Sequence, residues 1–137
     1  MISVLSTTNK YILQPSVIQM HHTSLSWLST SAFWKRELSF FQKLLEAAAF
    51  RVVSEAHKQR VDHFQSLITY YNGEVVDLIR KKLREHESHL AQSLQKENEA
   101  DTRYYEEHKA LMDEAESFEK SFRELKHELF SFVEEIF

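Results

Sequence analysis

Apolar residues recur along most of the chain at alternating intervals of three and four, which places them on one face of a helix. Three such stripes follow one another, from Trp27 to Val52, from Val61 to Leu94 and from Tyr104 to Ile136. The third is the most regular, because Leu, Phe, Ala and Ile fill most of its positions. Each stripe needs an apolar partner, so the pattern predicts long helices packed against one another.

The breaks between stripes predict where the helices end. Beyond Val52 the first stripe would continue onto polar residues only, so the chain must turn near residues 53–57. The Asn72-Gly73 pair resembles a turn, but the second stripe crosses it without a change of phase. We therefore expect one continuous helix there, in which glycine costs about 1 kcal/mol relative to alanine. A turn at this pair is the alternative.

The last break is marked by Asn98, a suitable C-terminal residue, and Asp101, a suitable N-cap. Short connections between long helices force neighbours to run antiparallel. The sequence thus predicts an all-α fold, an antiparallel bundle of three long helices preceded by an N-terminal arm. The predicted helices are approximately 23–52, 55–98 and 101–136, with the arm at 1–21 and the helical bundle domain at 22–137.

Composition agrees with this fold class. A length of 137 residues suits one domain, and one glycine and one proline leave too few turns for a sheet protein. With 42% hydrophobic and 28% charged residues, the chain is expected to be globular rather than disordered. No run of 18 apolar residues and no secretion signal is visible, and no cysteine is present. We expect a cytoplasmic protein without disulfides or thiolate metal sites.

Charge narrows the possible partners. A net charge of -4 argues against a nucleic-acid-binding protein, which would need an excess of Lys and Arg. Residues 1–53 are basic on balance and residues 101–137 are acidic, so the first and last helices are expected to attract each other. Exposed pairs of this kind add little stability.

Helix lengths suggest a second subunit. The middle helix is predicted to be longer than the first, which leaves the apolar side of residues 86–98 uncovered. Either the N-terminal arm or a second copy could cover it. The C-terminal residues from Phe130 to Phe137 also carry more apolar surface than one stripe needs. We therefore expect a homodimer.

Histidines are the main anomaly of the sequence. The chain has eight, and His86 and His108 occupy stripe positions where leucine would be ordinary. Folding the helices back about turns near residues 54 and 98 brings histidines of three helices to one level. Imidazoles and carboxylates in a helical bundle can bind iron or zinc. The predicted metal ligands are His22, His86, His89, His108 and Asp113. The alternative is that His86 and His108 are boundary histidines bonded to a nearby Glu or to Tyr104.

The same residues resemble a known pattern. The sequence resembles an incomplete form of the hemerythrin-like pattern. The residues that carry the resemblance are a first-helix histidine, the mid-chain pair His86 and His89, and the H-x-x-x-x-D spacing from His108 to Asp113. That resemblance implies a bundle that binds iron or oxygen-related ligands. The H-x-x-x-E and H-x-x-x-H elements of the family are missing, so a full di-iron centre is not expected.

A second resemblance covers most of the helical part. The stretches 34–46, 62–68 and 77–87 are similar to small helical proteins of Bacteroidetes type, which carry no known activity. Catalytic signatures are lacking too, since one glycine permits neither a phosphate-binding loop nor a nucleophile elbow. We therefore expect a non-enzymatic helical-bundle protein whose role is binding or assembly. The alternative is a metal-binding, hemerythrin-like bundle.

Overall fold

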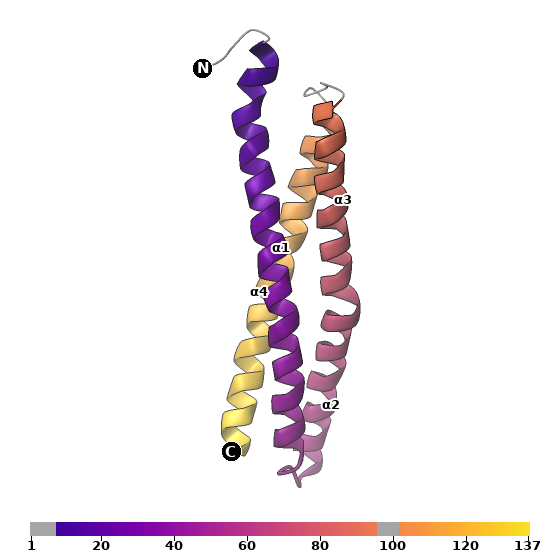
Figure 1. Cartoon of the computed structure of the whole chain (residues 1–137). Helices are drawn as coiled ribbons and strands as arrows, with labels where there is room; N and C mark the ends of the chain where they lie inside the picture. The colour runs from indigo at the N-terminus through magenta and orange to yellow at the C-terminus, as the bar shows by residue number, and fades with distance from the viewer. Residues whose placement is uncertain (1–7, 96–101) are drawn as a thin grey trace.

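The structure is a computed structural model that describes the backbone of residues 8–95 and 102–137 and the side chains of residues 17–92 and 103–137. Figure 1 shows three long rods side by side, formed by α1, by α2 continuing into α3, and by α4. The all-α antiparallel bundle of three long helices is thus confirmed. Its elements are α1 (Thr8–Ala49), α2 (Glu55–Tyr70), the π-helical turn η1 (Tyr71–Val75), α3 (Val76–Gln95) and α4 (Thr102–Ile136).

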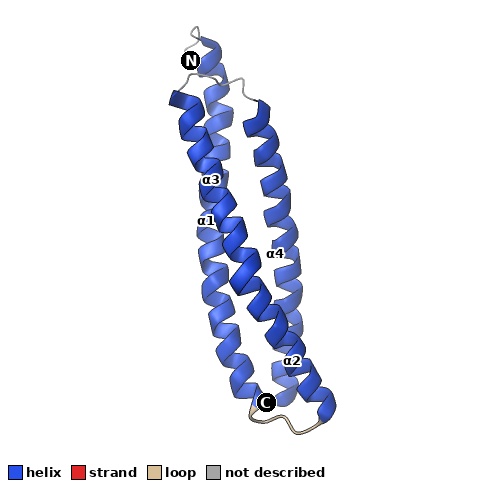
Figure 2. Cartoon of the chain, turned by 90° about the vertical axis from the view of Figure 1, so that its right-hand side faces the viewer, coloured by secondary structure: helices blue, strands red, loops and turns tan. Residues whose placement is uncertain are grey.

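Figure 2 shows the bundle from a perpendicular direction, and in the described part of the chain it contains helices and one short loop but no strand. The start of α1 lies at one end of the bundle and the C-terminus at the other (Figures 1 and 2). Within residues 8–95 and 102–137, none of the helices is long and apolar enough to span a membrane.

The first turn lies where the change of phase predicts it. The end of α1 tightens through a bond from Arg51 N to Ala48 O of 3.0 Å. Ser54 then adopts an extended backbone and its Oγ accepts from the backbone N–H of His57 at 3.1 Å, which satisfies a free donor at the start of α2. The helix ends at Ala49, three residues before the predicted limit of 52, because the last turn is taken up by this tightening.

The second rod is continuous through Asn72-Gly73, as predicted, but it does change phase there. The η1 turn contains a bond from Val76 N to Tyr71 O, five residues apart, which inserts one extra residue into the helix. As a result Val76 is fully buried, whereas Val75, the predicted stripe member, is only half-buried. Gly73 faces open space, so the helix needs no glycine there for packing. The predicted stripe was therefore wrong at Val75, whereas its next members Ile79, Leu83, His86 and Leu90 are buried as predicted.

The structure also differs at the start of the chain, where the expected arm is mostly helical. α1 begins at Thr8, so the predicted boundary between residues 21 and 22 lies inside a continuous helix that includes Pro15. The stripe continues toward the N-terminus at heptad spacing through Ser31 and Ser24 to Val17, all of them buried. The small polar residue Ser24, just before the predicted start at Trp27, hid this continuation of the stripe. Residues 1–7 and 96–101, including Asn98 and Asp101, lie outside the described residues.

The core fills one end of the bundle with large aromatic side chains. Trp34 of α1 packs edge-on against Phe118 of α4, with ring centroids 4.8 Å apart, and Phe41 lies 5.8 Å from Phe122. Aliphatic residues that are at most 2% exposed surround these rings. They are Leu38, Leu45, Ile68, Val76, Ile79, Leu83, Leu125 and Leu129.

At the other end, the extended α1 covers the part of α3 that a shorter first helix would have left open. Val17 is buried in a small cluster with Leu90 of α3 and Tyr104 of α4. Of the two alternatives, the N-terminal arm or a second copy, the N-terminal segment is therefore the one that covers residue 90. The bundle end formed by residues 17–31, 80–92 and 103–111 is called the histidine end below.

Candidate functional site

A buried hydrogen-bonded cluster lies at the histidine end, between α3 and α4. Its centre is His86, whose side chain is completely buried. Its Nδ1 lies 2.6 Å from Glu107 Oε1, and its Nε2 lies 3.0 Å from His108 Nδ1. In the neutral imidazole, Nδ1–H donates to the carboxylate and Nε2 accepts from the Nδ1–H of His108. One buried ring thus joins two residues of α4.

His89 adds a second imidazole to the same carboxylate. One helical turn beyond His86, its Nδ1 lies 2.9 Å and 3.1 Å from the two oxygens of Glu107. Burial opposes ionisation of this carboxyl, but the hydrogen bonds from His86 and His89 outweigh it and hold the pKa of Glu107 below its ordinary value. Glu107 is therefore a carboxylate shared by two imidazoles.

Two further residues of α4 close the cluster. The Tyr104 ring stacks on His86, with centroids 4.2 Å apart and planes 8° from parallel. Burial, together with the negative charges of Glu87 and Glu107, raises the pKa of Tyr104 above its ordinary value. Burial also lowers the pKa of His108, and the neighbouring charge of His86 adds to this effect. Both groups are thereby kept neutral at neutral pH.

α1 contributes small side chains that admit long polar ones from α3. Arg80 Nη1 donates to Ser31 Oγ at 2.7 Å and to the backbone oxygen of Leu28 at 3.0 Å. One heptad toward the bundle end, Glu87 contacts His21 in the corresponding position. Serine leaves space in the core at such positions, where leucine would exclude the guanidinium. The histidine end is therefore held by polar contacts between all three helices.

The structure brings together three of the five predicted metal ligands. His86, His89 and His108 lie in one cluster, with Glu107 as an additional member. His22 instead lies exposed on α1, where it lines a groove facing α4. Asp113 is exposed and pairs with Lys109 at 3.5 Å. The assignment of these residues as metal ligands stays a prediction.

Sequence reasoning missed Glu107, although a signal was present. Glu107 directly precedes the stripe residue His108, so it flanks the stripe on the side that faces α3. In the part of the chain with described side chains, no group of three or more His, Asp or Glu residues is placed to hold a metal ion. The cluster donors bond to one another instead: His86 directs its two nitrogens at two different partners.

A second candidate site is the side of α1 that faces away from the bundle. Four large apolar residues are 44–59% exposed there: Ile18, Leu25, Phe33 and Phe40. Heptad spacing relates Ile18 to Leu25 and Phe33 to Phe40, so the four line two neighbouring rows of the helix. Among the exposed residues between and beside them, some are small, and others are longer and polar or charged, namely Gln19, His22, Arg36, Lys43 and Glu46. We call the apolar and small positions of this side the α1 outer face: Ile18, Leu25, Ser26, Ser29, Ala32, Phe33, Ser39, Phe40 and Ala47.

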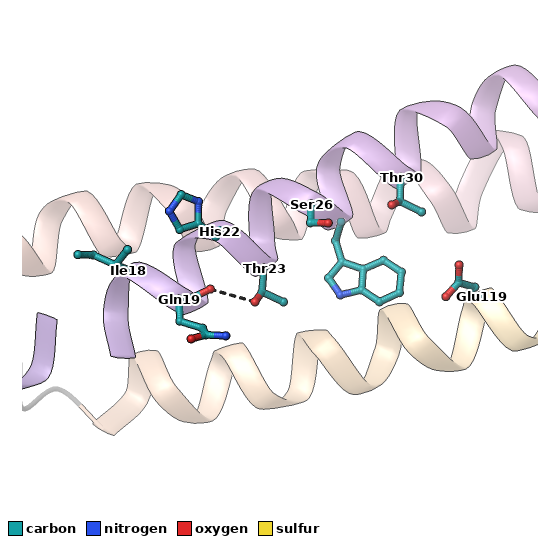
Figure 3. A pocket seen from close by; sticks show the side chains of 8 residues that line it. Ile18, Gln19, His22, Thr23, Ser26, Thr30 and Glu119 are labelled. Atoms are coloured by element: carbon teal, nitrogen blue, oxygen red, sulfur yellow. Dashed lines mark hydrogen bonds between the residues drawn. The ribbon is translucent and has the colours of Figure 1, made fainter. Parts of the chain in front are cut away.

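The α1 outer face continues into an open groove between α1 and α4. The groove has a volume of about 700 Å³, and Trp27 contributes to its wall. Figure 3 shows that Ile18, His22 and Ser26 approach it from α1, while Glu119 approaches from α4. Because the groove is wide and shallow, it suits a large surface better than an enclosed small molecule.

Comparisons with known proteins add no further information. No protein-family model matches the chain, and neither the curated proteins nor the solved structures gave a significant match. The resemblance to hemerythrin-like bundles therefore rests only on the sequence pattern that includes His86, His89, His108 and Asp113.

Proposed function

We propose that this protein is a non-enzymatic helical-bundle protein of binding and assembly, whose interaction surface is the α1 outer face. One observation carries the proposal: α1 presents apolar side chains to both the core and the solvent. A helix with apolar residues on opposite sides ordinarily has a partner on each side. The bundle covers only one of them.

Charge separates this face from the other exposed surfaces. In α1, the charged residues among the exposed positions from 18 to 50 are Arg36, Lys43 and Glu46. α4 exposes Glu, Asp, Lys or Arg at most of its outward positions. Interface centres are depleted of charged residues and enriched in aromatic ones. The α1 outer face has the two aromatic residues, Phe33 and Phe40, and α1 exposes fewer charged residues than α4 does, with Arg36 and Lys43 lying beside the aromatic rings.

Light scattering during gel filtration tests the proposal. The natural chain is expected to elute at twice its monomer mass of 16.3 kDa. In the double variant Phe33→Glu/Phe40→Glu, four charges would enter each symmetric interface, so we expect a monomer that retains the helical circular dichroism. A matched control is Tyr70→Glu/Leu78→Glu, which replaces residues 50% and 48% exposed on the second rod. The control should remain a dimer; a monomeric natural chain would contradict the proposal.

Metal binding at the histidine end is the second candidate function. It is favoured by the position of Glu107, which lies within 2.9 Å of one imidazole nitrogen from His86 and one from His89. Two imidazoles and a carboxylate suit zinc or iron. An ion would have to replace the hydrogen bonds that now join these groups, and the imidazoles would have to be unprotonated.

Metal analysis of protein purified without a histidine tag tests this second candidate. If the cluster binds metal, the natural chain should retain about one ion per chain after dialysis, as in a site with three protein ligands. His86→Ala and Glu107→Ala should lose the ion, while His22→Ala, which alters an exposed histidine outside the cluster, should keep it. Metal-free natural protein after incubation with zinc and iron would exclude the role.

A further inference from the structure

We infer that the histidine end contains a binding site for one internal water molecule, held by Ser24 of α1, Glu87 of α3 and Tyr104 of α4. The site is independent of the proposed assembly function. Each of the three side chains has a buried oxygen atom without a hydrogen-bond partner among the side chains that the structure describes, namely Ser24 Oγ, Glu87 Oε2 and Tyr104 OH. Buried polar atoms ordinarily have partners, so these three oxygens call for one.

The register of α1 and α3 places Ser24 and Glu87 at one level of the bundle. One heptad away, Arg80 Nη1 of α3 donates to Ser31 Oγ of α1 at 2.7 Å. Because the two helices run antiparallel, the next heptad positions toward the bundle end are Ser24 and Glu87, which again lie side by side. His21, one turn from Ser24, contacts Glu87 and supports this register.

Tyr104 reaches the same level from α4. Its ring stacks on His86, the residue before Glu87. After burial, the charge of Glu87 contributes most to raising the pKa of Tyr104, as expected for a carboxylate near the phenol. Val17 of α1, one heptad from Ser24, lies in the same buried cluster as Tyr104. The three oxygen atoms therefore belong to one layer between the three helices.

The layer is enclosed and has room beside Ser24. Ser24 is 0% exposed and Tyr104 is 5% exposed, while Val17 and Leu90 cover the layer toward the bundle end. The heptad row of Ser24 is filled farther along by Leu38, and serine is smaller than leucine. At Ser31, the other serine of this row, Arg80 enters the space. At Ser24 a water molecule can do so.

The side chains are held in place, which favours a bridging molecule over direct bonds. The Tyr104 ring is fixed by its stacking on His86, with centroids 4.2 Å apart and planes 8° from parallel. Glu87 is fixed through Oε1, which contacts His21. The side chain of Ser24 is too short to reach across to another helix.

The hydrogen-bonding capacities of the three groups fit a water molecule. The ionised carboxylate of Glu87 only accepts, whereas the hydroxyls of Ser24 and Tyr104 can donate. A water molecule would donate to Glu87 Oε2 and accept from both hydroxyls. Internal waters typically make about three such bonds. The water would thereby connect α1, α3 and α4 at the histidine end.

Oxygen-17 relaxation dispersion tests the site, because it counts long-lived internal waters in solution. Ser24→Val removes the hydroxyl and fills the space, so this variant should hold one long-lived water fewer than the natural chain. Ser88→Val is the matched control, since Ser88 is exposed on α3, and it should leave the number unchanged. Circular dichroism checks that both variants stay helical. Equal numbers in the natural chain and Ser24→Val would overturn the inference.

A crystal structure of the natural chain tests the site without any substitution. We expect one water within about 3.2 Å of Ser24 Oγ, Glu87 Oε2 and Tyr104 OH. A direct bond from Tyr104 OH to Glu87 Oε2, with no water beside Ser24, would overturn the inference. So would an ion at about 2.0–2.2 Å from the Glu87 carboxylate, which would make the layer a metal site.

Discussion

α1 and α4 are both long helices of one bundle, yet they distribute their apolar residues differently. α4 directs Leu111, Phe118 and Phe122 into the core and covers its outer side with charges. α1 places Ser24 and Ser31 at buried positions and exposes Phe33 and Phe40. Its polar and apolar residues are correspondingly less separated than those of α4.

The difference indicates what each helix is built to contact. A helix that packs on one side and meets water on the other needs strong separation, as α4 has. α1 gives up core volume at Ser31 and receives Arg80 of α3 there, while it keeps apolar surface outside. It is therefore the helix between two partners, the bundle on one side and, in our proposal, a second copy on the other.

The largest expected effect concerns the core side of α4. Phe122→Ala removes a ring that is 1% exposed and contacts Trp34, Phe41 and Phe118. The resulting cavity should lower the free energy of unfolding by about 3–5 kcal/mol. Urea denaturation measures this loss. A change below about 1 kcal/mol would mean that the aromatic core does not pack as described.

A smaller effect is expected at the histidine end. His86→Leu keeps the volume of the stripe but leaves His108 Nδ1 without its partner and removes one hydrogen bond from Glu107. We expect a loss of about 1–3 kcal/mol in the free energy of unfolding. Hydrogen exchange should show that the amides around residues 80–92 and 103–111 lose the most protection. A stabilised variant would show that the polar cluster is dispensable.

Acid should weaken the same end. Burial and the charge of His86 depress the pKa of His108, so the unfolded chain takes up this proton at a higher pH than the folded one. Stability from this group is complete above its ordinary value of 6.5 and is lost as pH falls toward the depressed folded value. The depressed pKa of Glu107 adds a further loss below its ordinary value of 4.5.

Urea midpoints measured at several pH values test this dependence. The natural chain should lose stability between about pH 7 and about pH 5. His108→Leu should flatten that part of the curve, because it removes the titrating group from the buried position. A natural chain that gains stability over this range would contradict the direction of the shift in the pKa of His108.

The smallest effect on the bundle itself is expected on the outer side of α1. Phe40→Ser removes an exposed ring, so at concentrations where the protein is monomeric its free energy of unfolding should change by less than about 0.5 kcal/mol. The dimer should nevertheless dissociate at lower concentration. Comparing urea unfolding with the concentration dependence of the mass separates the two effects. A loss of several kcal/mol in the monomer would assign Phe40 to the core.

Most of the fold could be predicted from the sequence because three stripes carry large apolar residues in regular phase. Prediction failed where small or polar residues occupy buried positions. Ser24, a buried polar residue, lies just before the predicted start of the first stripe at Trp27, and the start of α1 at Thr8 was missed. The one-residue shift at η1 was also missed, because Val75 and Val76 are equally apolar and only the structure shows which of them is buried.

The candidate sites were less predictable for a similar reason. The heights of His86, His89 and His108 follow from the turns, so their clustering could be anticipated. The direction of a polar side chain depends on its bonding partner, so the position of Glu107 next to His108 in the sequence did not by itself show that its carboxylate bonds His86 and His89. The α1 outer face was also missed, because core and solvent sides cannot be separated in a helix that is apolar on both.

Sedimentation equilibrium of the natural chain over a wide range of concentrations tests the central claim most directly. We expect a reversible transition from the 16.3 kDa monomer to a species of twice that mass. Phe33→Glu/Phe40→Glu should abolish the transition, and Tyr70→Glu/Leu78→Glu should leave it in place. A natural chain that remains a monomer at the highest concentration would contradict the account of α1 as a helix between two partners.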